Sequence, residues 1–186
     1  MKNKFLILLS SAILCSLFFA ACKKDDSTNP TNFIKIDDES QNVETGYIRY
    51  IRQIPDKPVY LNMLDLLGKG LTLVIEADTI NDWKGVGNVL TFFLSSSASD
   101  GIAAGNYQYD SGSNLYSETY IAGWFGKGVN VTDDSGEFFE IQNGILKVER
   151  SNDSYQISFD GFTTDNKKVT AYYSGVLPVY KFAWHY

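Results

Sequence analysis

The chain has 186 residues, of which 44% are hydrophobic and 15% aromatic, and its formal net charge at neutral pH is −6. An acidic chain lacks the excess of Lys and Arg that neutralises phosphates, so nucleic acid is excluded as an expected partner. The length fits one ordinary domain, which can bury a core without help from a disulfide or a metal ion.

The first 21 residues have the layout of an export signal. Lysines stand near the start, residues 5–21 carry no charge, and two alanines precede Cys22. This layout predicts the removal of residues 1–21 as a signal peptide. A retained membrane helix is the weaker alternative, because a span needs about 20 apolar residues and this run is shorter and contains serines. Plain secretion is weaker still, since ordinary cleavage after Ala21 would leave bulky Phe19 where a small side chain is needed.

The junction Ala20-Ala21-Cys22 resembles the lipobox of bacterial lipoproteins, with Phe19 in place of the commoner leucine. The resemblance implies that the Cys22 sulfur carries a diacylglycerol and that its amino group is acylated. Two or more acyl chains give stable anchoring, so the membrane is the expected partner of Cys22. The run from Cys22 to Asp26 also resembles the start of surface lipoproteins of the Bacteroidota. This second resemblance implies an outer-membrane location and display on the cell surface.

Residues 22–32 are polar and contain Pro30, which predicts a flexible tether between the membrane and the domain. Residues 33–186 then alternate short β-branched and aromatic runs with Gly, Asn, Asp and Ser, which is typical of an all-β domain. The exception is residues 62–67, where apolar residues at helical spacing predict a helix of one or two turns. Trp83 is expected in a loop between two strands.

The predicted strands fall at intervals of about ten residues. They cover residues 45–54, 59–61, 71–76, 89–94, 105–109, 118–125, 138–141, 145–148, 155–160, 169–177 and the C-terminal run from 180. Asn143-Gly144 is the dipeptide that favours a tight hairpin turn, so a turn is predicted there. Neighbouring strands joined in this way form a single antiparallel meander. Both a flattened barrel and a two-sheet sandwich fit that pattern.

The glycine-punctuated series from Gly105 to Gly175 resembles small calycin-like or sandwich lipoproteins of the Bacteroidota. The likeness is one of pattern, and it implies no catalytic residue. It agrees with the lipoprotein signal at Cys22 in pointing to a small all-β envelope protein.

Aromatic side chains are the candidate ligand-binding residues. Trp83 and Trp124 are each set beside glycines or turn residues, where they can line the mouth of a pocket. Tyr180, Phe182 and Trp184 share one face of the last predicted strand at a period of two. Core packing is the competing interpretation for all five. Ring faces that stay exposed would stack on a glycan, a small apolar molecule or a protein.

The residues that usually carry catalysis are sparse. His185 is the single histidine, and the two cysteines are Cys15, in the signal peptide, and the acylated Cys22. A histidine-based triad, thiol catalysis, a metal site and a cofactor are therefore not expected. Glu76 and Asp78 are two residues apart and would lie on one face of a strand, which leaves a carboxylate-based hydrolase as a distant third hypothesis.

The sequence predicts a binding or interaction protein, not an enzyme, anchored in the outer membrane by lipid. The alternative is a structural envelope or surface-assembly component without a ligand pocket. A cavity lined by Trp83 or Trp124 would favour the first function, and a solid core with an exposed edge strand would favour the second.

Overall fold

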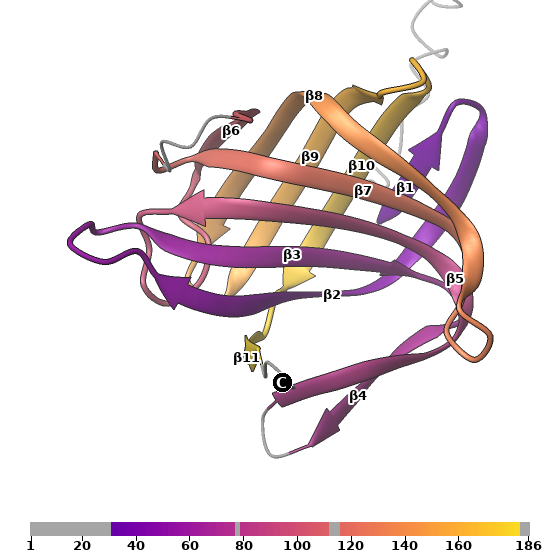
Figure 1. Ribbon diagram of the computed structural model, residues 1–186, viewed down its shortest axis with the longest axis horizontal. Helices are drawn as coiled ribbons and strands as arrows, with labels where there is room; N and C mark the ends of the chain where they lie inside the picture. Colours follow the sequence, from indigo (N-terminus) through magenta and orange to yellow (C-terminus); the bar gives the residue numbers. More distant parts are fainter. Residues whose placement is uncertain (1–30, 77–78, 112–115, 183–186) are drawn as a thin grey trace, which may run out of the picture. The chain divides into compact units, whose positions relative to one another are not determined.

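The computed structural model describes residues 31–76, 79–111 and 116–182, and all the regular structure in these residues is β-strand (Figure 1). By its contacts the chain divides into residues Met1–Pro30, outside the described residues, and Thr31–Tyr186. The strands are β1 (Phe33–Ile36), β2 (Glu39–Gln53), β3 (Tyr60–Gly68), β4 (Leu71–Glu76), β5 (Thr79–Ser96), β6 (Gly105–Tyr109), β7 (Thr119–Asn130), β8 (Ser135–Ser151), β9 (Ser154–Thr163), β10 (Lys168–Val176) and β11 (Val179–Phe182). The predicted single, all-β antiparallel domain is confirmed.

The strands belong to one sheet whose pairings close on themselves. The ring runs β1, β2, β3, β5, β7, β8, β9, β10 and back to β1, and every pair in it is antiparallel. In Figure 1, β2, β3, β5 and β7 form a front layer and β9 and β10 lie behind it, with β8 bending from one layer to the other. Within the described residues, the parallel pairs are those of β6 with β7 and of β11 with β2 and with β5.

The larger core fills the space inside the ring. It includes side chains from opposite layers, such as Ile48, Leu64, Phe92, Phe125 and Phe159, each exposed by 3% or less. Phe92 and Phe159 meet with their ring centroids 4.8 Å apart. Alternation along each strand sends one set of side chains inward and leaves the other set for the outer face.

The second core lies outside the ring, beneath a hairpin. The strand β4 pairs with the first half of β5, and this β4–β5 hairpin stands away from the sheet before β5 enters the ring (Figure 1). The strand bends at Gly85, whose φ of +98° is unfavourable for other residues and whose Cβ would lie 2.0 Å from the Gly70 carbonyl oxygen. Tyr47, Leu67, Leu71 and Val129 are among the residues buried between the hairpin and the sheet.

The predicted helix at residues 62–67 is wrong, because these residues lie within β3. Both faces of β3 are covered: Leu64 and Leu66 point into the ring, whereas Leu67 joins the core under the hairpin. A strand with apolar residues on both faces loses its period of two, and the residual spacing imitates a helix.

Two predicted breaks between strands are also wrong. Trp83 lies in β5 and not in a loop, since the hairpin makes that stretch a paired strand. Asn143-Gly144 lies within the continuous strand β8, which pairs with β9 on both sides of it and shifts register between Ile141 and Asn143. Gly144 therefore has its positive φ, +120°, within a paired strand and not in a turn, just after the shift in register.

Candidate ligand-binding cleft

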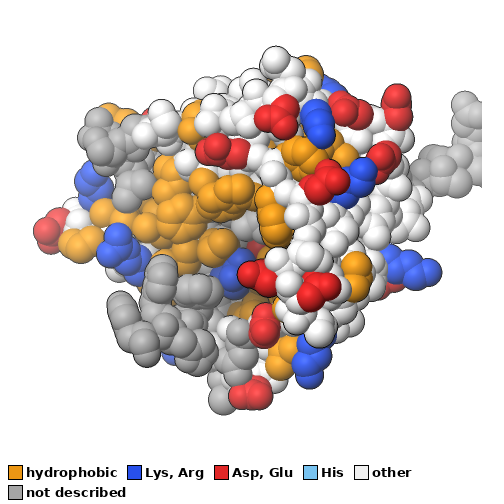
Figure 2. Space-filling view, turned by 45° about the vertical axis from the view of Figure 1, so that its right-hand side comes forward, with side chains coloured by type: hydrophobic (Ala, Val, Ile, Leu, Met, Phe, Trp, Pro, Cys, Tyr) orange, Lys and Arg blue, Asp and Glu red, His pale blue; other side chains and the backbone are white. Residues whose placement is uncertain are grey.

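A cleft of about 410 Å³ opens on the outer face of the sheet beside the β4–β5 hairpin. Its volume lies in the range of small-molecule sites, about 300–1,000 Å³. The residues that line it include Arg49, Met63, Trp83, Thr91, Trp124 and Phe138. Figure 2 shows hydrophobic side chains gathered into a patch over this face of the molecule.

The sheet register brings the floor of the cleft together. Asp65 of β3 lies opposite Thr91 of β5, and Thr91 lies opposite Trp124 of β7. These residues therefore form one row across three strands, all on the outer face. In the next row, Val89 of β5 lies opposite Gly126 of β7, and Gly126 lies opposite Phe138 of β8. Outward side chains two positions apart on each strand thus build a continuous surface.

The polar groups of the floor bond to one another. Asp65 is completely buried, and its carboxylate accepts hydrogen bonds from Arg49 Nε at 2.7 Å and from Arg49 Nη2 at 3.0 Å. The Thr91 hydroxyl donates to the same carboxylate at 2.7 Å. A buried acid needs such partners, because an unpaired charge out of water is costly. The bidentate geometry fixes the Arg49 side chain along the floor.

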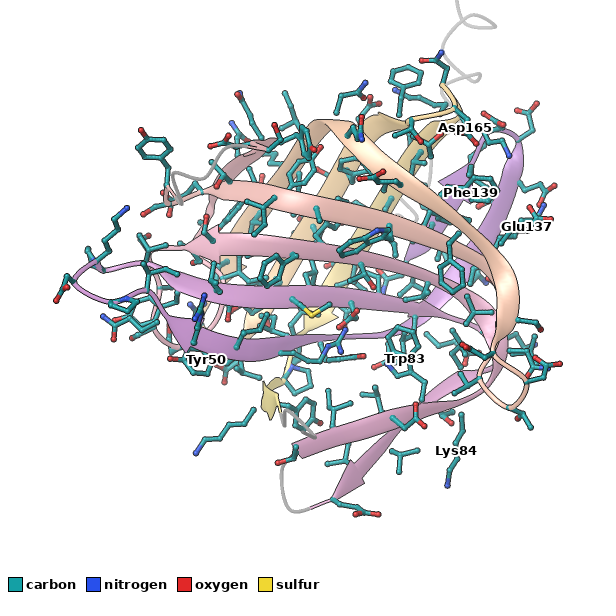
Figure 3. The ribbon with its side chains drawn as sticks, in the orientation of Figure 1. Tyr50, Trp83, Lys84, Glu137, Phe139 and Asp165 are labelled. Carbon is teal, nitrogen blue, oxygen red and sulfur yellow. The ribbon has the colours of Figure 1, made fainter. Side chains whose placement is uncertain are left out.

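Trp83 forms the wall on the hairpin side. In Figure 3 its side chain points from the lower arm of β5 toward the sheet, while that of Lys84 points the other way. The indole Nε1–H of Trp83 donates a hydrogen bond to the Tyr47 hydroxyl on β2. The guanidinium carbon of Arg49 lies 5.8 Å from the centre of the Trp83 ring and 5.9 Å from that of Tyr47. Cation–π contact therefore helps to hold the hairpin against the sheet.

Burial governs the charge states of the residues behind the floor. Burial, assisted by the Asp65 carboxylate, raises the pKa of Tyr47 far above its ordinary value. Burial alone would lower the pKa of Arg49, but the attraction of Asp65, its hydrogen bonds and the influence of Tyr47 together raise it. Tyr47 is thus neutral and Arg49 positive throughout the physiological range. Together with the Asp65 carboxylate that it binds, the Arg49 guanidinium makes a charge-balanced pair.

Trp124 and Phe138 form the opposite wall and are the most exposed apolar side chains of the cleft, at 38% and 59%. Gly126 lies between them on the floor, and a Cβ there would come within 3.1 Å of the Phe138 ring and 2.9 Å of Val89. The glycine therefore lets the Phe138 ring lie close to the backbone. Large exposed aromatic rings usually mark a surface that is covered by a partner or a ligand.

The structure brings two of the predicted aromatic residues into this cleft, Trp83 and Trp124. Tyr180 packs instead behind the site, edge-on to Tyr47 at 6.3 Å between ring centroids. Phe182 ends β11, where its backbone partner is Ile80. Trp184 lies outside the described residues, as does Cys22.

The sequence did not predict the polar floor. Its one signal is Asp65, an acid inside the otherwise apolar stretch Leu64 to Leu67, which must find a partner if the stretch is buried. Of the two carboxylates predicted as a pair, Glu76 ends β4, whereas Asp78 lies outside the described residues. That pairing stays a hypothesis.

Among residues 31–76, 79–111 and 116–182, no group of three or more His, Cys, Asp and Glu side chains could hold a metal ion. The same residues include no helix long and apolar enough to cross a membrane. No known protein family, curated protein or solved structure matches the chain.

Proposed function

We propose that the protein is a binding protein, anchored in the outer membrane through acyl chains on Cys22, whose ligand occupies the cleft between the β4–β5 hairpin and the sheet. The lipid holds the domain at the membrane, and residues 22–32 form the tether between the lipid and the domain. The cleft supplies the binding surface. No covalent chemistry is assigned to it.

The observation that carries this proposal is the convergence of Trp83 and Trp124 on one cleft. They come from different strands, β5 and β7, and from opposite sides of the hollow. Trp124 and Phe138 remain exposed although an apolar core lies directly beneath them. If these two rings served only packing, we would expect them to be buried, because burial of an aromatic side chain stabilises the fold by about 1.5–3 kcal/mol.

The test is to purify the lipidated protein from outer membranes and to identify the small molecules that come with it. Mass spectrometry of the extract would be compared between the parent and Trp124→Ala. We expect at least one compound to be enriched on the parent and lost from the variant. Phe162→Ala is the matched control, because Phe162 is 40% exposed and lies on β9, away from the cleft. Equal recovery from the parent and Trp124→Ala would contradict the proposal.

The anchor has its own test. Cells grown with labelled palmitate should incorporate the label into the parent protein, and Cys22→Ser should abolish it. Protease treatment of whole cells should degrade the domain if it is displayed outward. An unlabelled parent protein would contradict the lipid anchor and leave the cleft proposal standing.

One observation favours a second function, that of a structural envelope component. The inside of the ring holds packed aromatic and aliphatic side chains, including Tyr107, Tyr120 and Phe125, each completely buried. A solid core is the feature expected of a structural component, whereas a binding protein with a cleft on its outer face does not require one. The two functions differ at the cleft, since loss of both Trp124 and Phe138 would leave a structural part working normally.

A further inference from the structure

We infer that the cleft takes a neutral, apolar small molecule with an aromatic or alicyclic body, and not a sugar. This inference rests on the proposed function, because it names the ligand class of the same site. It follows from three properties of the cleft: how its polar groups are used, how its charges are balanced, and which residues form its walls.

The polar groups of the floor already form hydrogen bonds within the protein. The Asp65 carboxylate accepts hydrogen bonds from Arg49 and from Thr91. The Trp83 indole N–H donates a hydrogen bond to the Tyr47 hydroxyl. A sugar carries hydroxyl groups around its ring, and each that is buried without a partner costs about 1–3 kcal/mol. Sugar hydroxyls in the cleft would therefore have to share these groups with the bonds already made, whereas an apolar ligand leaves all of those bonds in place.

The charge balance of the floor disfavours ionised ligands of either sign. The Arg49 side chain is 12% exposed and Asp65 is completely buried, so the pair offers no net charge to a ligand. An ion brought into the cleft would lose water without gaining a partner. A cation would also meet competition, because the Arg49 guanidinium already lies over the Trp83 and Tyr47 rings. The cleft therefore selects neutral molecules.

The walls suit a ring-shaped ligand. Trp83 stands on one side, Trp124 and Phe138 on the other, and Met63 and Val89 complete the apolar lining. Aromatic pairs gain about 0.5–1.5 kcal/mol beyond the burial of their area when rings meet edge to face or offset. The cleft volume of about 410 Å³ limits the bound part to a small molecule.

The test uses the lipidated full-length protein in lipid nanodiscs with N-phenyl-1-naphthylamine, a neutral apolar fluorophore. Uptake of the probe by lipid is the same for every variant. The difference in saturable binding between variants therefore measures binding in the cleft. We expect Trp124→Ala and Phe138→Ala each to weaken saturable binding at least tenfold, and Phe162→Ala to leave it unchanged. Neutral naphthalene should displace the probe. Naphthalene sulfonate, naphthylmethylammonium and cellobiose should be at least tenfold less effective.

The outcomes separate this inference from the function on which it rests. If cellobiose or either charged naphthalene displaces the probe as well as naphthalene does, the cleft is a binding site and only the ligand class is wrong. If cellobiose binds the parent and not Trp124→Ala, the same conclusion holds. If neither Trp124→Ala nor Phe138→Ala changes the binding of any of these compounds, the inference and the proposed function both fail.

Discussion

Arg49 holds both oxygens of the Asp65 carboxylate, from Nε at 2.7 Å and from Nη2 at 3.0 Å, at a point on the outer face of the sheet where Asp65 has no exposure to water. The pair joins β2 to β3 and forms the floor of the cleft. Its partners lie 16 residues apart and meet only because these two strands are adjacent. The stability of the domain and the shape of the site thus depend on the same contact.

Asp65→Asn should destabilise the domain strongly, because it leaves the Arg49 charge buried without its counterion. Loss of one member of a buried pair costs about 3–5 kcal/mol. Urea unfolding of the parent and the variant would measure the difference. The control is Lys147→Ala, which breaks an ion pair with Glu149 whose side chains are 54% and 53% exposed, and which should cost at most about 1 kcal/mol. Similar losses of unfolding free energy in the two variants would contradict the interpretation of Arg49 and Asp65 as a buried ion pair.

Stability should fall in alkali because of buried tyrosines. Burial raises the pKa of Tyr47, Tyr107 and Tyr120 above the ordinary value of about 10. Below pH 10 both the folded and the unfolded chain keep these protons, so their contribution is fully present. Above pH 10 only the unfolded chain ionises, and stability should fall by about 1.4 kcal/mol per pH unit for each tyrosine, until the folded pKa is reached.

Tyr120→Phe tests the predicted fall of the unfolding free energy with pH. It removes one of the three groups, so urea unfolding between pH 9 and pH 12 should show a shallower decline than in the parent. The hydroxyl of Tyr120 has a long hydrogen bond, 3.4 Å to the Gly144 carbonyl oxygen, so the loss at neutral pH should be small. An unchanged slope above pH 10 would show that Tyr120 does not contribute.

Gly144→Ala should be far more damaging than Gly128→Ala. Both residues have positive φ, +120° and +59°, so each substitution carries a backbone cost of about 1–2 kcal/mol. At Gly144 the new Cβ would also lie 2.5 Å from the Asp160 carbonyl oxygen and 2.6 Å from the Gly161 Cα, whereas at Gly128 nothing lies within 4 Å. We expect a difference of at least about 2 kcal/mol in unfolding free energy, measured in urea. Equal costs would contradict the close approach of β8 and β9.

Trp83→Phe should loosen the hairpin without weakening the ring. The substitution keeps an aromatic wall but removes the hydrogen bond to the Tyr47 hydroxyl, a loss of about 1 kcal/mol. Amide hydrogen exchange should become several-fold faster in β4 and in the part of β5 that pairs with it. Exchange in β9 and β10 should stay the same, since those strands pair with β1, with β8 and with each other, and not with the hairpin. Faster exchange throughout the domain would mean that the hairpin and the ring open together.

The strands that could be predicted from the sequence are those with one face buried. In β9, Tyr155, Ile157 and Phe159 are buried and the residues between them are polar, so the period of two is plain and turn residues mark both ends. β3 was misread because both its faces are covered. Asn143-Gly144 was misread because a glycine with positive φ can lie in a hairpin turn or in an irregular part of a strand, and the dipeptide alone does not distinguish them.

The sequence predicted that Trp83 and Trp124 could line the mouth of one pocket, but it did not predict the strand pairing that brings them together. Trp83 and Trp124 stood out as large rings beside glycines or turn residues. That they share a cleft depends on the bend of β5 at Gly85 and on the register of β5 with β7, which are properties of pairing between distant strands. The pairing of Arg49 with Asp65 has the same origin. A single sequence carries little information about such contacts.

The closure of the ring has a consequence for how the chain folds. β1 pairs with β10, and Asn32 and Ser174, which are bonded beside this junction, lie 142 positions apart. The ring therefore cannot close until nearly the whole chain is present. Contacts so distant along the sequence make folding slow, on the order of milliseconds to seconds. A nascent chain that lacks β10 has no partner for the free side of β1, so the ring stays incomplete until the last strands are made.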